Sequence, residues 1–156
     1  MTRLHGDPPY KTVFVHGGPG AIGSLIACAC EVSRLSNTGI VEALQSKYSI
    51  AGLIEELHAQ VAQNCQEGAA LVGHSWGAWL SALFAKEYPE LCKTIVLIGC
   101  PPLTDAYVGE ISSRRMQNLS EKECEVFRRL TGSAATGADM EQIPKILEKA
   151  DNYCLE

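Results

Sequence analysis

Four short apolar runs alternate, over the first hundred residues, with stretches in which apolar side chains recur every three or four positions. The runs are rich in Val, Ile and Leu and are bounded by Gly, Pro or Ser, which is typical of strands buried on both faces of a parallel sheet. We therefore predict four strands, at TVFVH (12–16), GIVEAL (39–44), AALVG (69–73) and TIVLIG (94–99).

Helices are predicted between these strands, at residues 21–35, 50–65 and 76–87. The second has an apolar stripe at helical spacing, with Ser49 as its N-cap. The third repeats the stripe with Trp76, Trp79, Leu80, Leu83 and Phe84. A repeated order of strand, helix and strand predicts a parallel α/β sheet with right-handed crossovers.

The chain changes character after the fourth run. Residues 104–156 have no strand pattern and indicate short amphipathic helices, with a capping box formed by Ser120 and Glu123. We expect an α/β core over residues 1–103, followed by a helical lid over 104–156. Further helix boundaries are predicted at Gly132, as a stop, and at Asp139, as an N-cap.

The segment GHSWG (73–77) follows the third strand directly and precedes a helix. This is the context that the G-x-S-x-G nucleophile elbow requires. Small residues at Gly73 and Gly77 allow a tight turn that exposes the serine hydroxyl, and the helix N-terminus faces any oxyanion that forms. Ser75 is therefore the candidate nucleophile.

A second motif, HGGPG (16–20), follows the first strand in the same way. Its glycines allow a backbone N–H to point into open space, as an oxyanion hole needs from the loop opposite the elbow. The two motifs together are far more specific than either one alone.

With these motifs the sequence resembles the α/β-hydrolase superfamily over residues 12–103, most closely the branch of prolyl iminopeptidases, which pairs HGGPG with a Trp after the nucleophile. The resemblance implies that Ser75 is the nucleophile and that the N–H groups of Trp76 and Gly18 form the oxyanion hole. Pro19 has no N–H, and His16 is expected to shape the loop.

The resemblance also implies a strand order in which the second run lies outside the first, followed by the third and the fourth. HGGPG and GHSWG then both open into the crevice at the carboxyl ends of the strands.

The chain has no histidine after Ser75, although the superfamily order is serine, acid, histidine. We interpret His74 as a packing residue and His58 as a boundary residue, and Asp105 is a weak candidate for the acid. Since loss of the serine or the histidine of such a triad costs on the order of 10^6 in turnover, we expect the isolated chain to be nearly inactive.

We expect the acid and the histidine to come from sequence beyond the present chain or from another chain. TIVLIG would then be a strand at a sheet edge, which favours a partner or self-association there. The pattern DQRG-x-G-x-S of prolyl iminopeptidases is replaced by EALQSKYS (42–49), which leaves the substrate open.

The composition argues against several classes of partner and cofactor. The chain has 156 residues, 46% of them hydrophobic and 20% charged, with a net charge of -5, which argues against a nucleic-acid partner. No apolar segment is long enough to be a signal sequence or a membrane span. Seven cysteines without a CxxC pair predict free thiols and a cytoplasmic protein without a metal site. No nucleotide-binding motif is present, and we expect no cofactor.

Three hypotheses follow. The first is a serine hydrolase that cleaves an ester, an amide or an N-terminal peptide bond of a small molecule or short peptide through an acyl-enzyme at Ser75. The second is a protein without catalytic activity that keeps the crevice for a ligand or partner. The third is self-association that lends His5 or His58 across an interface.

Overall fold

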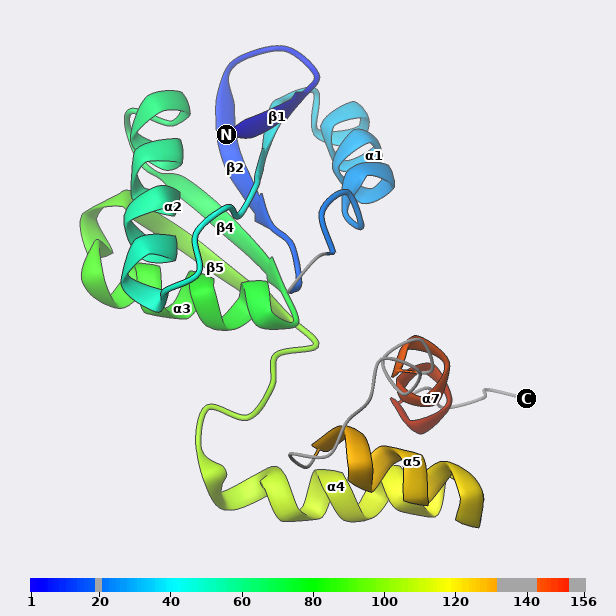
Figure 1. Ribbon diagram of the computed structural model, residues 1–156. Helices are drawn as coiled ribbons and strands as arrows, with labels where there is room; N and C mark the ends of the chain where they lie inside the picture. The colour runs from blue at the N-terminus through cyan, green and yellow to red at the C-terminus, as the bar shows by residue number, and fades with distance from the viewer. Residues whose placement is uncertain (19–20, 132–142, 152–156) are drawn as a thin grey trace. The chain divides into compact units, whose positions relative to one another are not determined.

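The computed structural model describes residues 1–18, 21–131 and 143–151. The chain forms two compact units, Met1–Pro101 and Pro102–Glu156, and each is described by itself (Figure 1).

The first unit is built on a five-stranded sheet with the order β1-β3-β2-β4-β5. The strands are β1 (Thr2–His5), β2 (Tyr10–Val15), β3 (Gly39–Ala43), β4 (Ala69–His74) and β5 (Cys92–Ile98). Strands β2 to β5 are parallel, so the four predicted strands and their implied order are confirmed. Strand β1 was not predicted, because TRLH is too short and too polar to stand out; it pairs antiparallel with β3.

Helices cover both faces of this sheet (Figure 1). They are α1 (Ile26–Ser36), α2 (Ile50–Asn64) and α3 (Trp76–Glu87), with a 3-10 helix η1 at Pro89–Leu91. The predicted N-cap of α2 is confirmed, since Ser49 Oγ accepts a hydrogen bond from the Gly52 N–H at 3.1 Å. Helix α1 begins five residues later than predicted, because hydrogen-bonded turns at Ala21 and Gly23 precede it.

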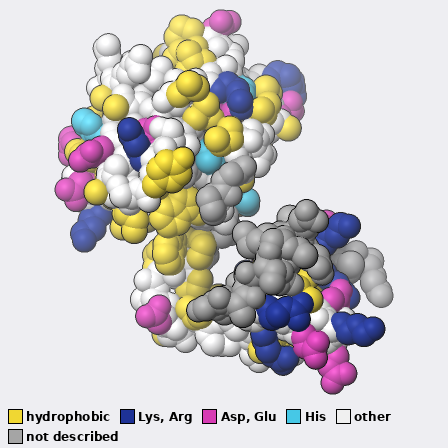
Figure 2. Space-filling model, in the orientation of Figure 1, with side chains coloured by type: hydrophobic (Ala, Val, Ile, Leu, Met, Phe, Trp, Pro, Cys, Tyr) yellow, Lys and Arg dark blue, Asp and Glu magenta, His cyan; other side chains and the backbone are white. Residues whose placement is uncertain are grey.

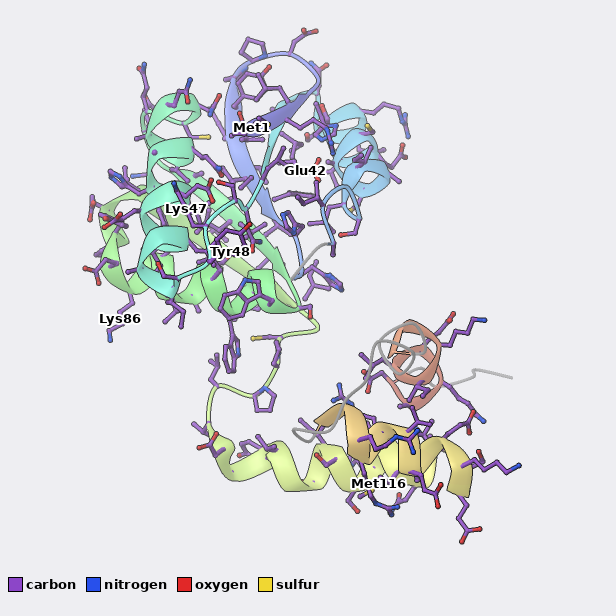
Figure 3. The ribbon with its side chains drawn as sticks, in the orientation of Figure 1. Met1, Glu42, Lys47, Tyr48, Lys86 and Met116 are labelled. Atoms are coloured by element: carbon purple, nitrogen blue, oxygen red, sulfur yellow. The ribbon has the colours of Figure 1, made fainter. Side chains whose placement is uncertain are left out.

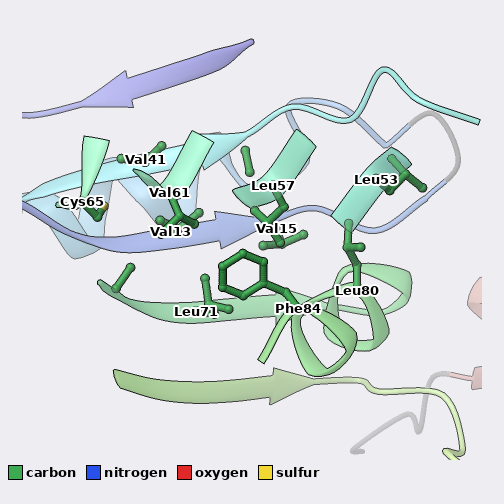
Figure 4. Close-up of a cluster of buried hydrophobic side chains, with 12 residues drawn as sticks. Val13, Val15, Val41, Leu53, Leu57, Val61, Cys65, Leu71, Leu80 and Phe84 are labelled. Carbon is green, nitrogen blue, oxygen red and sulfur yellow. The ribbon is translucent and has the colours of Figure 1, made fainter. Parts of the chain in front are cut away.

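The main core lies between the sheet and the helices α2 and α3 (Figure 4). Strand residues Val13, Val15, Val41 and Leu71 pack there against Leu53, Leu57, Val61, Leu80 and Phe84. On the other face, Phe14 and Ile40 pack against Ala29 of α1. Because successive strand residues point to opposite faces, a run such as VFV is buried on both sides.

Strand β5 lies at one edge of the sheet, as expected, and its side chains are largely exposed. Its apolar side chains Ile95, Val96, Leu97 and Ile98 are 37–45% exposed. Figure 2 shows hydrophobic side chains at several places on the surface of the first unit. An apolar edge of this kind is a template for pairing with a further strand.

Helices are the only secondary-structure elements among the described residues of the second unit. Its elements are the 3-10 helix η2 (Asp105–Tyr107), α4 (Val108–Gln117), α5 (Glu121–Thr131) and α7 (Ile143–Asp151). A small core lies between α5 and α7 and is made by Leu119, Cys124, Phe127, Ile146 and Ala150, with Met116 of α4 packed against it. None of the helices described in either unit is long and apolar enough to cross a membrane.

The capping box at the start of α5 is confirmed. The Ser120 N–H donates to Glu123 Oε2 at 2.7 Å, and the Glu123 N–H returns a bond to Ser120 Oγ at 3.5 Å. Glu123 also accepts from Lys149 of α7 at 2.7 Å. The hydrogen bonds from Lys149 and Ser120 lower the pKa of Glu123 to about 2. The boundaries predicted at Gly132 and Asp139 lie outside the described residues.

Candidate active site

The turn between β4 and α3 holds Ser75 in a conformation that few side chains adopt. Its backbone angles are φ 54° and ψ -123°, so the residue has a positive φ without being glycine. The Ser75 N–H donates to the carbonyl of Ile98 in β5 at 2.9 Å, which ties the turn to the neighbouring strand. Strain of this kind persists only where the surroundings hold it, and it is concentrated at functional sites.

The two glycines of GHSWG are required by close approaches of the backbone. A Cβ at Gly77 would overlap the carbonyl oxygen of Val15 at the end of β2, and a Cβ at Gly73 would overlap the carbonyl oxygen of Gly77. Only glycine therefore lets α3 start this close to the sheet. The tight turn is what presents Ser75 at the carboxyl end of β4.

The loop after β2 lies against this turn. A Cβ built on Gly17 would lie 3.3 Å from Ser75 Cβ, and one built on Gly18 would lie 2.8 Å from Trp76 Cδ1. Trp76 is the first residue of α3, so its N–H has no helical carbonyl to bind. The structure thus brings Gly18, Ser75 and Trp76 together at one end of the sheet.

Gln45 belongs to neither motif of the sequence, yet it links the two. Its side-chain amide donates to the carbonyl of His16 at 2.8 Å, and its Oε1 accepts from the indole Nε1 of Trp76 at 3.0 Å. The signal in the sequence was its position directly after the second strand, at the same end of the sheet. Gln45 therefore fixes the position of the loop after β2 relative to the start of α3.

His16 is buried and has both ring nitrogens engaged. A carbonyl oxygen only accepts, so Nδ1 donates to the Gly17 carbonyl, at 2.5 Å, and Nε2 accepts from the Gln45 N–H, at 3.4 Å. These bonds fix the shape of the loop and leave neither nitrogen to act as a base on Ser75.

The other three histidines form no hydrogen bond with Ser75 in the part of the chain that the structure describes. His5 is 7% exposed and is hydrogen-bonded to Glu42 and Cys30. That His5 is lent to Ser75 across an interface stays a prediction. His58 is half-buried and stacks on Tyr88, with ring centroids 4.2 Å apart.

His74 is exposed, so its interpretation as a packing residue is also wrong. It is the last residue of β4, and the positions near its ring, Gly17 and Gly99, have no side chains to cover it. Asp105, the weak candidate for the acid, begins η2 in the second unit and is exposed.

A cavity of about 450 Å³ opens beside Trp76. His16, Gln45 and Leu53 line it together with Lys47 and Tyr48 of the β3–α2 loop (Figure 3). A larger cavity of about 640 Å³ lies at the opposite ends of the strands, near Tyr10 and Lys93. Ligands of open parallel sheets bind at the carboxyl ends, so the smaller cavity is the one that belongs to the candidate site.

No three His, Cys, Asp or Glu side chains among the described residues gather closely enough to hold a metal ion.

The sheet order, the helices on both faces and the strand, turn and helix around Ser75 define an α/β-hydrolase fold. The model of the alpha/beta hydrolase fold family matches residues 33–123, which is more than half of the chain, so the chain belongs to this family.

Solved structures show the same fold. The crystal structure of VinJ matches with a TM-score of 0.74 and 17% identity, over 94% of this chain and 55% of that one. A proline iminopeptidase from Mycobacterium smegmatis matches with a TM-score of 0.66 and 16% identity, over 95% of this chain and 56% of that one. An epoxide hydrolase from Bacillus megaterium, in complex with an inhibitor, matches with a TM-score of 0.56 and 19% identity, over 96% of this chain and 57% of that one.

At these identities the likeness shows the fold alone. The chain spans about half the length of the structures that it matches. No curated protein matches the sequence.

Proposed function

We propose that the protein is a serine hydrolase that cleaves an ester, an amide or an N-terminal peptide bond through an acyl-enzyme at Ser75. The observation that carries the proposal is the backbone of Ser75, with a positive φ between β4 and the start of α3. A fold that only needed a turn here would use glycine, because a serine is strained at this φ. The strain is understandable if the hydroxyl itself is needed.

In the proposed reaction, Ser75 Oγ attacks the carbonyl carbon of the substrate, and the charge that develops on the carbonyl oxygen is bound by the N–H groups of Trp76 and Gly18. The N-terminal end of α3 adds the favourable field of its dipole. Gln45 supports this geometry, since its two hydrogen bonds join the carbonyl before Gly17 to the Trp76 ring. Removing one oxyanion donor typically costs about 10²–10³ in turnover.

A base is still needed, because a serine hydroxyl is a weak nucleophile without one. We propose that a histidine and its acid come from residues other than those described, in this polypeptide or in a partner, and that their strand joins the sheet at β5. The exposed apolar side chains of β5 support this edge as the place of attachment.

The finer assignments belong to the same proposal. HGGPG and Trp76 favour the prolyl iminopeptidase-like branch, and residues 104–156 are proposed to act as the lid over a small-molecule or short-peptide substrate. The six cysteines that the structure describes are all free, which supports a reducing compartment such as the cytoplasm.

Fluorophosphonate labelling tests the nucleophile. We expect the probe to label Ser75 rapidly in the protein isolated from its natural source and far more slowly in the 156-residue chain. The intact mass of the natural protein shows which further residues or partner chains are present. Ser75→Ala is the control and should abolish labelling in both. Equal labelling of both preparations would refute the need for a second source of the base, and labelling at another residue would refute the nucleophile.

A second candidate function is supported by one observation: every histidine lies upstream of Ser75, and none is hydrogen-bonded to it in the described part of the chain. The protein would then bind a ligand or partner in the cavity beside Trp76 without catalysis. Its test is a ligand that binds equally well to Ser75→Ala, together with no ester turnover in any assembly. Turnover that depends on Ser75 would exclude it.

A further inference from the structure

A buried carboxylate lies on the face of the sheet that packs against α1 (Figure 3). Glu42 of β3 is fully buried and accepts three hydrogen bonds. They come from Arg3 Nη1 at 2.8 Å, from His5 Nε2 at 3.1 Å and from the Gly23 N–H at 3.2 Å. A buried charge is tolerated only when it is paired and hydrogen-bonded, and this one is both.

His5 lies between Glu42 and a thiol and is hydrogen-bonded to both. Because a carboxylate only accepts, His5 Nε2 carries the hydrogen that Glu42 binds, and Nδ1 is left as an acceptor. Cys30 Sγ lies 3.4 Å from that Nδ1. The acid from β3, the imidazole from β1 and the thiol from α1 thus form a chain in the order that activated thiols use.

Cys30 is the exposed end of this chain. Its side chain is open to solvent, whereas His5 is 7% exposed and Glu42 is fully buried. A reagent can therefore reach the sulfur while the base and the acid stay fixed behind it. None of these residues takes part in the site around Ser75.

We propose that Cys30 is a modification site, a thiol activated by His5 and Glu42 that reacts with low-molecular-weight disulfides. The Cys30 thiol gives its proton to His5 Nδ1, and the thiolate attacks one sulfur of the disulfide R–S–S–R. The S–S bond breaks, a mixed disulfide Cys30–S–S–R forms, and the thiolate R–S⁻ leaves and takes the proton from His5. Cys30 is oxidised as the reagent is reduced, so electrons balance.

The charges around the cluster favour this proton transfer. Arg3 and Glu42 form an ion pair, and after the transfer His5 is cationic between the Glu42 carboxylate and the Cys30 thiolate. Each new charge therefore has an opposite neighbour. A purely structural role would use the same contacts to join β1, β3 and α1, but would leave Cys30 as an ordinary thiol.

Cys28 is the matched control within the same helix. It is also exposed, but it lies two positions before Cys30, and helical side chains at i and i+2 do not face each other. Cys28 is thus neither a contact of His5 nor placed to displace R–S⁻ from Cys30. The adduct on Cys30 should persist as a mixed disulfide.

The experiment compares Cys28→Ser, which leaves Cys30, with Cys30→Ser, which leaves Cys28. Each protein is reacted at pH 7 with oxidised glutathione, and in parallel with iodoacetamide, and the modified peptide is followed by mass spectrometry. Because the thiolate is the reacting form, we expect Cys30 to react about tenfold faster than Cys28. Equal rates, or a disulfide between Cys28 and Cys30 in the natural sequence, would overturn the proposal.

A further variant identifies the base. His5→Gln, made in the Cys28→Ser background, should lower the rate of Cys30 to that of Cys28. Cys65 reports on folding, since it is buried and its burial raises the pKa of its thiol to about 11. An unchanged Cys30 rate with Cys65 still protected contradicts the role of His5. If Cys65 becomes reactive, the comparison of Cys30 with Cys28 in the folded proteins decides the proposal.

Discussion

Ser75 and Cys30 lie in the same compact unit, and each has what the other lacks. Ser75 sits on a strained turn beside Gly18 and Trp76 and near a cavity of about 450 Å³, but no histidine among the described residues is hydrogen-bonded to it. Cys30 sits on a regular helix at the surface, with His5 and Glu42 in line behind it.

This difference separates two parts of nucleophilic catalysis. The position of the nucleophile and its oxyanion donors come from one short turn and the loop beside it. A proton-accepting chain, in contrast, must be assembled from several elements, here β1, β3 and α1. A thiol gains reactivity from such a chain alone, whereas a serine hydroxyl needs both parts.

The largest expected effect is on the serine side of the comparison. In any assembly that turns over an ester, Ser75→Ala should lower turnover by on the order of 10^6, because the nucleophile is removed. Turnover of a chromogenic ester is the measurement. Cys30→Ala is the matched control and should leave turnover unchanged. If the two substitutions have equal effects, the separation of the two nucleophiles is wrong.

The second effect tests the strained turn. Gly77→Ala places a Cβ on the carbonyl oxygens of Val15 and His16, which are backbone atoms that move only with the sheet. We expect a loss of about 3 kcal/mol in the free energy of unfolding, measured by urea denaturation. In the control Gly109→Ala, the new Cβ meets nothing within 4 Å. That variant should be unchanged or up to about 1 kcal/mol more stable, as expected for alanine in a helix.

A smaller effect concerns β5 as the edge at which a further strand pairs. Val96 is 43% exposed on β5, so Val96→Lys should weaken self-association of the 156-residue chain roughly tenfold, or about 1.4 kcal/mol. Sedimentation at several concentrations measures it. Leu35→Lys is the control, because Leu35 is 69% exposed on α1, away from that edge. A similar change with Leu35→Lys would mean that the edge has no special role.

The smallest effect tests whether Gln45 positions the proposed oxyanion donors. Gln45→Leu removes the hydrogen bonds to the His16 carbonyl and the Trp76 indole. Since one hydrogen bond contributes about 1 kcal/mol, the rate of fluorophosphonate labelling should fall about fivefold without unfolding. Gln63→Leu, on the exposed side of α2, should label as the natural protein does. An unchanged rate for Gln45→Leu would remove Gln45 from the site.

Much of the fold could be predicted from local patterns. The four parallel strands were found because apolar runs such as TIVLIG must be buried, and the helices because their stripes recur at helical spacing. The capping box at Ser120 and the N-cap at Ser49 were found because they are interactions between near neighbours. Strand β1 was missed because four largely polar residues give no pattern of their own.

The sequence by itself determined the two motifs and the turn that holds Ser75, because each depends on short segments with strict steric demands, whereas the order of the strands came only from the resemblance to a family. Only the tertiary structure decided which side chains meet across elements. It exposed His74, inserted Gln45 between His16 and Trp76, and aligned Glu42, His5 and Cys30 from three elements. Such contacts join residues far apart in the chain, and no periodicity or spacing records them.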